Sequence, residues 1–191
     1  MNPNEILGVL EKRGAVLRGH FKLSSGRHSD VFVQKFRVLE EPRLAQGFGS
    51  AIASSFPEGF DVVASPAVGA VVLGFATALA GEARFVFAER ADGEMSLRRG
   101  FAIEPHERVL VVEDVITTGG SAREVVALVR RSAGSVVGVG ALIDRGDPVR
   151  PADLGAQLRA LIKLDVSSWD PADCPLCERN EPLDDPGSRR L

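Results

Sequence analysis

The chain has 191 residues, 45% of them hydrophobic, which is enough for one domain with a sizeable core. Its net charge of −3 gives no general attraction to nucleic acid or to anionic membranes. No apolar stretch reaches the roughly 20 residues that span a bilayer, and two cysteines are too few for a disulfide scaffold. We therefore expect a cytoplasmic protein that binds neither nucleic acid nor membranes.

The first part of the chain alternates helical and extended patterns. A helix capped by Asn4 is predicted through Arg13, and alternation at Val31 and Val33 indicates a strand after a turn. Helical periodicity returns in residues 41–56. These segments precede the most apolar part of the sequence.

Short runs of Val, Leu and Ile then alternate with helical segments. Strands are predicted over 60–65, 83–89, 108–114 and 135–144, and helices over 71–81 and 121–134. This order is typical of a mostly parallel sheet with helices on both faces. A polar stretch over 90–107 predicts an exposed hairpin or loop.

The composition changes after Asp147. Residues 148–166 predict a further strand or short helix, and the Pro- and Asp-rich remainder predicts loops. We expect one domain over 1–191, with a core over about 40–147. The two ends, about 1–39 and 148–191, are the candidates for a small hood subdomain beside the sheet.

The sequence VLVVEDVITTGGS, residues 109–121, carries the clearest chemistry. Its apolar run predicts a central strand, and ligands of open α/β sheets bind where such strands end. Glu113 and Asp114 stand at that end, where their carboxylates can accept hydrogen bonds from sugar hydroxyls. The glycines and hydroxyls that follow open a helix, whose N–H groups favour phosphate. The stretch predicts a site for a phosphorylated sugar.

Simpler interpretations of this stretch remain open. Thr117, Thr118 and Ser121 could serve only as caps of a strand-turn-helix connection. The stretch is neither a Walker loop, because no lysine follows the glycines, nor a dinucleotide fingerprint.

The thirteen residues resemble the signature of the type I phosphoribosyltransferases. Within that family the chain is similar to the branch that uses orotate, since HFKLSSGRHSDVF, ALIDRGD and CPLCERNEPL resemble segments of that branch. The resemblance implies the type I phosphoribosyltransferase fold. It also implies transfer of ribose 5-phosphate from 5-phosphoribosyl 1-diphosphate (PRPP) to N1 of orotate, a step in UMP biosynthesis. Mg²⁺ would arrive with the diphosphate.

The resemblance assigns substrate contacts residue by residue. Arg145 would pair with the orotate carboxylate, with Thr117, Ser24 and Ser25 beside the base. The loop SPAVG would touch diphosphate, although it lacks the lysine that many members carry and could be a plain turn. The residues assigned to PRPP are Ala67, Val68, Gly69, Arg90, Glu113, Asp114, Val115, Ile116, Thr117, Thr118, Gly119, Gly120 and Ser121.

The mobile catalytic loop departs from the family pattern. ERADGEMSLRRGF contains none of the lysines or the histidine found in many relatives. Arg90, Arg98 and Arg99 are the candidates to replace their charge, alongside the catalytic acids Glu113 and Asp114. Arg98 and Arg99 could instead belong to a solvated face. In the family this loop enters the neighbouring subunit's site, which implies a homodimer.

Two other functions compete with this interpretation. The chain could use another base, such as a purine, although a purine offers Arg145 no carboxylate. It could also be a regulator that keeps the fold without catalysis. We expect no protein-held metal: CPLC (174–177) supplies half of a zinc site, and the remaining ligands could come only from a second subunit or from distant His20, His28 and His106.

Overall fold

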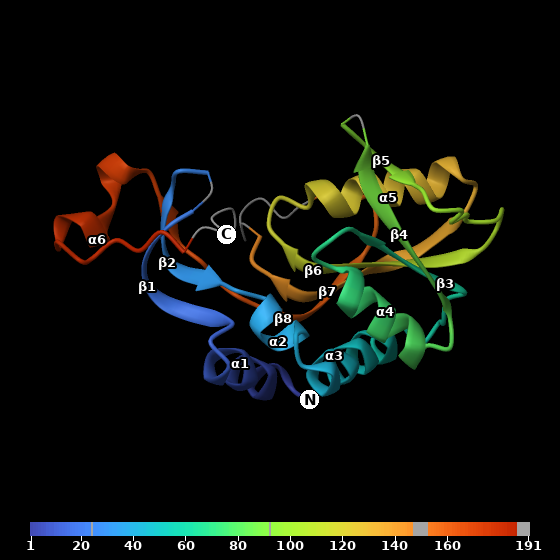
Figure 1. Cartoon of the computed structure of the whole chain (residues 1–191), viewed down its shortest axis with the longest axis horizontal. Helices are drawn as coiled ribbons and strands as arrows, with labels where there is room; N and C mark the ends of the chain where they lie inside the picture. Colours follow the sequence, from blue (N-terminus) through green and yellow to red (C-terminus); the bar gives the residue numbers. More distant parts are fainter. Residues whose placement is uncertain (24, 92, 147–152, 187–191) are drawn as a thin grey trace.

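The computed structural model describes residues 1–23, 25–91, 93–146 and 153–186. Its centre is a six-stranded sheet in the order β5-β4-β3-β6-β7-β8 (Figure 1). All neighbouring pairs are parallel except β4 and β5, which form an antiparallel hairpin at one edge. The strands are β3 (Val62–Pro66), β4 (Arg84–Ala91), β5 (Glu94–Leu97), β6 (Arg108–Ile116), β7 (Ser135–Asp144) and β8 (Leu158–Lys163).

Helices cover both faces of this sheet, as the alternating pattern predicts. On one face, α3 (Pro42–Ser54) and α4 (Val71–Ala80) pack with α1 (Pro3–Lys12) against Leu110 and Val112. On the other face, α5 (Gly120–Arg131) packs against Val109 and Val111. Successive residues of β6 point to opposite faces, and all four are fully buried. The predicted mostly parallel α/β fold is confirmed.

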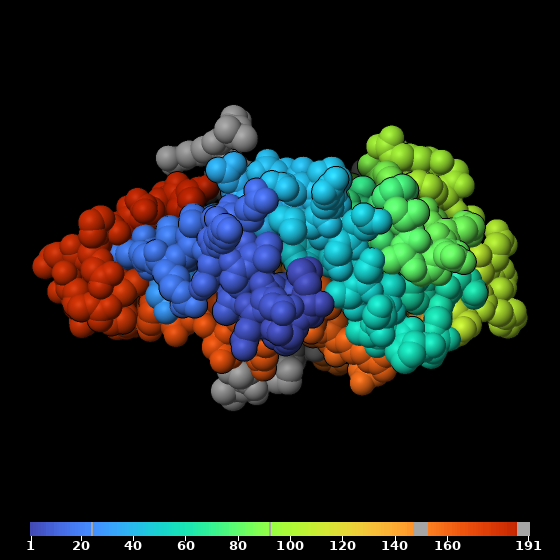
Figure 2. Space-filling view, turned by 90° about the horizontal axis from the view of Figure 1, so that it is seen from below, coloured from blue at the N-terminus to red at the C-terminus, as the bar shows by residue number. Residues whose placement is uncertain are grey.

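The hood lies at one end of the molecule. Its sheet contains β1 (Val16–Lys22), β2 (His28–Val33) and the two-residue β9 (Ser168–Trp169), in the order β1-β2-β9 with antiparallel pairs. A 3-10 turn (Pro171–Asp173) and α6 (Pro175–Glu178) continue from β9. The N-terminal hairpin and the C-terminal segment lie side by side in Figures 1 and 2.

Two boundaries differ from the sequence-based expectation. The first helix is capped by Asn2 rather than Asn4, because the Asn2 side chain accepts from Glu5 N and Glu5 bonds back to Asn2 N. β8 pairs with β7, so the core sheet extends to Lys163, beyond the boundary near 147 that we predicted. The apolar residues of this strand need a sheet partner, and β7 provides the open edge.

The short helix α2 (Phe36–Leu39) links the hood to α3. Among the described residues, none of the helices is both long enough and apolar enough to span a bilayer.

Candidate active site

Glu113 and Asp114 lie near the carboxyl end of β6, between β3 and β7 in the sheet. Only 8% of Glu113 and 2% of Asp114 is exposed. Glu113 Oε1 accepts a hydrogen bond from Asp114 N at 3.0 Å, and Asp114 Oδ1 accepts from Val115 N at 2.6 Å. These local bonds hold both carboxylates at the edge where the sequence predicts the sugar.

Burial changes the acidity of one member of the pair. Desolvation raises the pKa of Glu113 to about 8, and the nearby Asp114 charge adds to the rise, while Lys35 opposes it. Glu113 is therefore mostly protonated near neutral pH before a ligand binds. A protonated carboxyl can donate a hydrogen bond as well as accept one.

The turn after β6, where the sequence predicts phosphate binding, begins α5 at a left-handed glycine. Gly119 adopts a left-handed conformation (φ 71°, ψ 11°) and caps α5, which a glycine does at no steric cost. Thr117 and Thr118 are exposed, and no side chain caps the first turn of α5. Exposed threonines and a helix start without a side-chain cap thus lie next to the acidic pair.

The loop after β3 approaches the acids from the neighbouring strand. Ala67 N donates to Ala88 O at 2.8 Å, the Ala67–Val68 peptide is cis, and Val68 is 77% exposed. A Cβ at Gly69 would collide with the Asp114 carboxylate and lie 2.6 Å from Lys35 Nζ. Only a glycine leaves room for the loop to pass this close to the acids.

Lys35 is a site residue that the sequence interpretation missed. Its Nζ lies 2.5 Å from Asp114 Oδ2, although Lys35 precedes α2 and is far from Asp114 in sequence. Its only sequence signal is being one of four lysines, placed just after the predicted strand at 31–33. The open pocket here is lined by Lys35, Pro66, Ala67, Gly69, Glu113, Asp114, Val115 and Ser121.

Arg145 follows β7 at the same edge of the sheet. Its N–H donates to Ile116 O at 2.9 Å, which places it beside the start of the TTGGS turn. Partial burial lowers the pKa of its guanidinium. Ser25 lies in the β1–β2 turn of the hood, and Ser24 lies outside the described residues. The orotate contacts assigned to these residues stay predictions.

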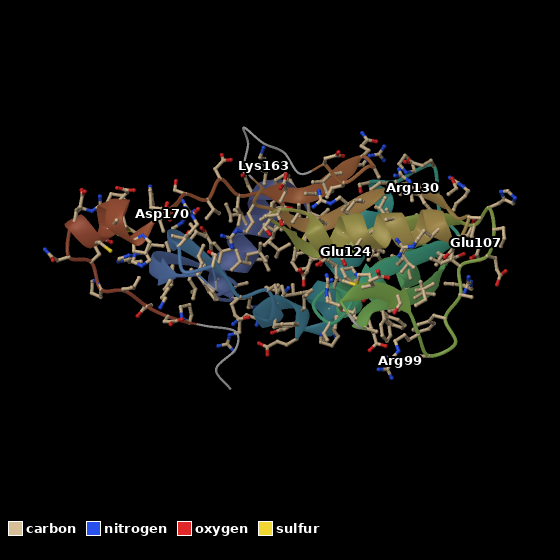
Figure 3. The ribbon with its side chains drawn as sticks, turned by 90° about the horizontal axis from the view of Figure 1, so that it is seen from above. Arg99, Glu107, Glu124, Arg130, Lys163 and Asp170 are labelled. Atoms are coloured by element: carbon tan, nitrogen blue, oxygen red, sulfur yellow. The ribbon has the colours of Figure 1, made fainter. Side chains whose placement is uncertain are left out.

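The loop arginines do not line this pocket. Arg90 pairs with Glu124 of α5 at 2.8 Å, and Arg99 pairs with Glu89 at 2.8 Å. Figure 3 shows Arg99 on the hairpin side of the sheet and Glu124 on α5. Arg98 is exposed just after β5. Their catalytic role therefore needs a rearrangement of the hairpin or a second subunit, and stays a prediction.

Comparison with known proteins assigns the family. Residues 37–157 match the model of the phosphoribosyl transferase domain. The chain is 47% identical, over the full length of both proteins, to an orotate phosphoribosyltransferase of Pelotomaculum thermopropionicum. It is 46% identical to one of Thermotoga maritima, covering 96% of this chain and 97% of that protein. The chain belongs to the orotate phosphoribosyltransferase family.

Solved structures agree with this family assignment. The orotate phosphoribosyltransferase of Aeropyrum pernix has a TM-score of 0.70 at 28% identity, covering 83% of this chain and 93% of that one. An adenine phosphoribosyltransferase of Rhodothermus marinus has a TM-score of 0.66 at 24% identity, covering 84% and 99%. The second likeness shows the shared fold alone, whereas the full-length orotate relatives support the predicted activity over the purine alternative.

Proposed function

We propose that this enzyme transfers ribose 5-phosphate from PRPP to N1 of orotate, giving orotidine 5′-monophosphate and diphosphate for pyrimidine biosynthesis. The observation that carries the proposal is the buried pair Glu113 and Asp114 immediately before an open helix N-terminus. Acids for a sugar and N–H groups for its phosphate lie on one short stretch of chain. Arg145, at the same sheet edge, supplies a cation for the carboxylate of orotate.

The acidic pair and the turn after β6 bind different parts of the ribose 5-phosphate. The turn 117–121 binds the 5′-phosphate through N–H groups and hydroxyls. Glu113 and Asp114 bind the ribose 2′ and 3′ hydroxyls. As the bond to diphosphate breaks, positive charge develops on the ribose ring, and the buried carboxylate of Asp114 stabilises it. Orotate N1 then forms the new bond to C1 of ribose and loses its proton, which the departing diphosphate can accept, so no protein nucleophile is required.

Lys35 and the 67–69 loop serve the leaving group in this proposal. Mg²⁺ would arrive with the diphosphate and would offset its negative charge, and a protein cage is unnecessary because Mg²⁺ prefers water and phosphate oxygens. The loop lacks the lysine of many relatives, and Lys35 Nζ sits beside it, next to Gly69. Lys35 can exchange its contact with Asp114 for one with the diphosphate.

We also propose a homodimer. Helix α4 exposes an apolar stripe at helical spacing, with Val72 43%, Phe75 58% and Leu79 61% exposed. A second copy that covers this stripe would bury it and could bring its own β4–β5 hairpin to the site. The loop arginines would then act in trans.

The experiment that tests the activity is a base panel. Purified protein is incubated with Mg²⁺ and PRPP together with orotate, uracil, adenine or hypoxanthine, and nucleotide products are separated by chromatography. Formation of orotidine 5′-monophosphate alone supports the proposal. A purine nucleotide as the main product would contradict it, and PRPP binding without any product would favour a regulator.

A further inference from the structure

Four side chains with metal-binding atoms meet in the hood, away from the pocket described above. They are His20 of β1, His28 at the start of β2, and Cys174 and Cys177 around α6. His20 is 3% exposed, His28 5% and Cys174 is fully buried. Their donor atoms all lie within 4.8 Å of one another. The two sequence segments are separated by about 150 residues and meet only through the fold (Figures 1 and 2).

The spacing of most of the donor atoms is close to that of a tetrahedral metal site. His20 Nε2 lies 3.0 Å from His28 Nδ1, 3.5 Å from Cys174 Sγ and 3.7 Å from Cys177 Sγ. Cys177 Sγ lies 3.3 Å from His28 Nδ1. Bond lengths of about 2.0 Å to nitrogen and 2.3 Å to sulfur place tetrahedral zinc ligands roughly 3.3–3.8 Å apart. These four distances lie near that range, and the donor atoms that are up to 4.8 Å apart would have to approach each other by about 1 Å.

A second contact orients one of the imidazoles. His20 Nδ1 lies 2.9 Å from the backbone carbonyl oxygen of Glu181. Because a carbonyl oxygen only accepts hydrogen bonds, Nδ1 must carry a hydrogen and donate it. His20 Nε2 then carries a lone pair that points into the cluster. Metal-bound histidines are held in this way by a carbonyl on the other ring nitrogen. The lone pair of Nε2 can accept only one hydrogen bond. Three other potential metal ligands nevertheless lie within 3.7 Å of this nitrogen, as expected if one cation binds all four.

We propose that His20, His28, Cys174 and Cys177 bind one structural Zn²⁺ ion. Thiolates and imidazoles together favour zinc over magnesium or calcium. Binding releases one proton from each thiol, so Zn²⁺, two thiolates and two neutral imidazoles sum to zero charge. A neutral centre can be buried here without an uncompensated charge. Four protein ligands leave no open position, which makes the site structural rather than catalytic.

This proposal departs from the expectation that the sequence raised. CPLC supplied two ligands, and the other two appeared to be scattered histidines. The antiparallel pairing of β1 and β2 brings His20 and His28 together, with Lys22 opposite His28 in the register. The Phe21–Asp184 bridge and the Arg27–Asp170 pair then draw the C-terminal segment onto the hairpin.

The ion would join the two ends of the chain in the hood. The hood sheet is small, and β9 contributes only two residues to it. Small units with few strands need an additional constraint such as a metal to be stable. Between His20 and His28 runs the turn that carries Ser25, so the ion would also fix that turn.

The direct test is the metal content of the purified full-length protein. Wild type, the Cys174→Ser/Cys177→Ser double variant and a His106→Asn variant are expressed with zinc, passed through gel filtration, and measured by inductively coupled plasma mass spectrometry. His106 is exposed and has a left-handed φ of 69°, which asparagine tolerates, so it is a matched control. We expect about one zinc per chain in wild type and His106→Asn, and about tenfold less in the double variant.

A wild-type protein that is folded, contains no zinc and takes up none from a zinc buffer would overturn the proposal. If the double variant does not fold, the absorption spectrum of cobalt(II) bound to the wild-type protein tests the site instead. Cobalt(II) in a thiolate-containing tetrahedral site gives intense visible absorption and a sulfur-to-metal charge-transfer band in the near ultraviolet. Cobalt that gives only the weak spectrum of the hydrated ion would equally overturn it. None of these readouts depends on the proposed enzymatic activity.

Discussion

Gly69 and Asp114 show how closely the residues of the pocket depend on one another. A Cβ at Gly69 would strike the Asp114 carboxylate and Lys35. We predict that Gly69→Ala lowers kcat/KM about a hundredfold, because a displacement of about 1 Å at a catalytic group costs roughly that much. Gly8→Ala is the control, since a Cβ there meets nothing within 4 Å. Steady-state kinetics measure kcat/KM for both variants. An equal fall in the two variants, or no fall in either, would contradict this prediction.

Glu113 should make the stability of the ligand-free protein depend on pH. Its pKa is about 8 in the folded protein, against an ordinary value of 4.5. The folded state therefore keeps a proton that the unfolded chain loses between these values. This contribution is fully present below about pH 4.5 and is lost as pH rises toward 8, with a slope of at most about 1.4 kcal/mol per pH unit.

Glu113→Gln removes that proton and should flatten the pH dependence of the free energy of unfolding between about pH 5 and pH 8. Denaturant unfolding at several pH values measures it. Glu94→Gln, at an exposed carboxylate of β5, should keep the wild-type slope. If Glu113→Gln and wild type have equal slopes, Glu113 does not carry the raised pKa.

Arg145 should act on orotate and not on PRPP. We predict that Arg145→Ala raises KM for orotate by about 10- to 100-fold, the loss of a charged hydrogen-bond pair worth roughly 1.5–3 kcal/mol. KM for PRPP should change little. Arg131→Ala, at an exposed position near the end of α5, is the control. Equal increases in both KM values would remove Arg145 from the orotate site.

At the scale of elements, the β4–β5 hairpin carries arginines that we expect to act in the active site of the neighbouring subunit. Arg90 and Arg99 are held by Glu124 and Glu89 in the single chain. We predict that an Arg90/Arg98/Arg99 triple alanine variant and Asp114→Asn, each nearly inactive alone, recover activity when mixed. A mixed dimer contains one site with intact acids and an intact partner hairpin, so up to about a quarter of wild-type activity per site can return.

The mixing experiment is read after the subunits have exchanged, with each inactive variant mixed with itself as the control. Sedimentation analysis of the same samples shows whether dimers are present. Dimers that exchange subunits without any recovery would place the arginines in the site of their own chain, or outside catalysis.

Elements also show how far the sequence alone could predict this structure. The apolar run 109–112, the two acids and the TTGGS turn are local patterns, and they predicted a central strand, its functional end and a helix start. Lys35 at Asp114 and the approach of His20 to Cys174 are tertiary contacts between segments far apart in the chain. No local pattern encodes them, because they depend on how the hood folds back on the sheet.

β8 illustrates the same limit at the boundary of the core. The sequence of residues 148–166 predicts a strand or a short helix but does not indicate which sheet a strand would join. The open edge of β7 decides it, and α1 from the other end of the chain packs near the resulting strand. Hood and core are therefore interleaved in sequence rather than divided at one residue.

For the whole molecule, the proposed function places the binding of the sugar and of its phosphate on one short stretch of β6 and the turn after it. The parallel sheet places the 67–69 loop and Arg145 at the same edge, on the strands that flank β6. The hood adds Lys35. We predict that this edge of the sheet performs pentosyl transfer to orotate.

The most direct test follows orotate consumption by its ultraviolet absorbance, with PRPP and Mg²⁺, in wild type, Asp114→Asn and the exposed control Asp165→Asn. We predict Mg²⁺-dependent consumption by wild type and Asp165→Asn, and a fall of at least about a hundredfold in Asp114→Asn, with the fold intact by circular dichroism. If Asp114→Asn keeps the full turnover of wild type, the acidic pair does not take part in the reaction.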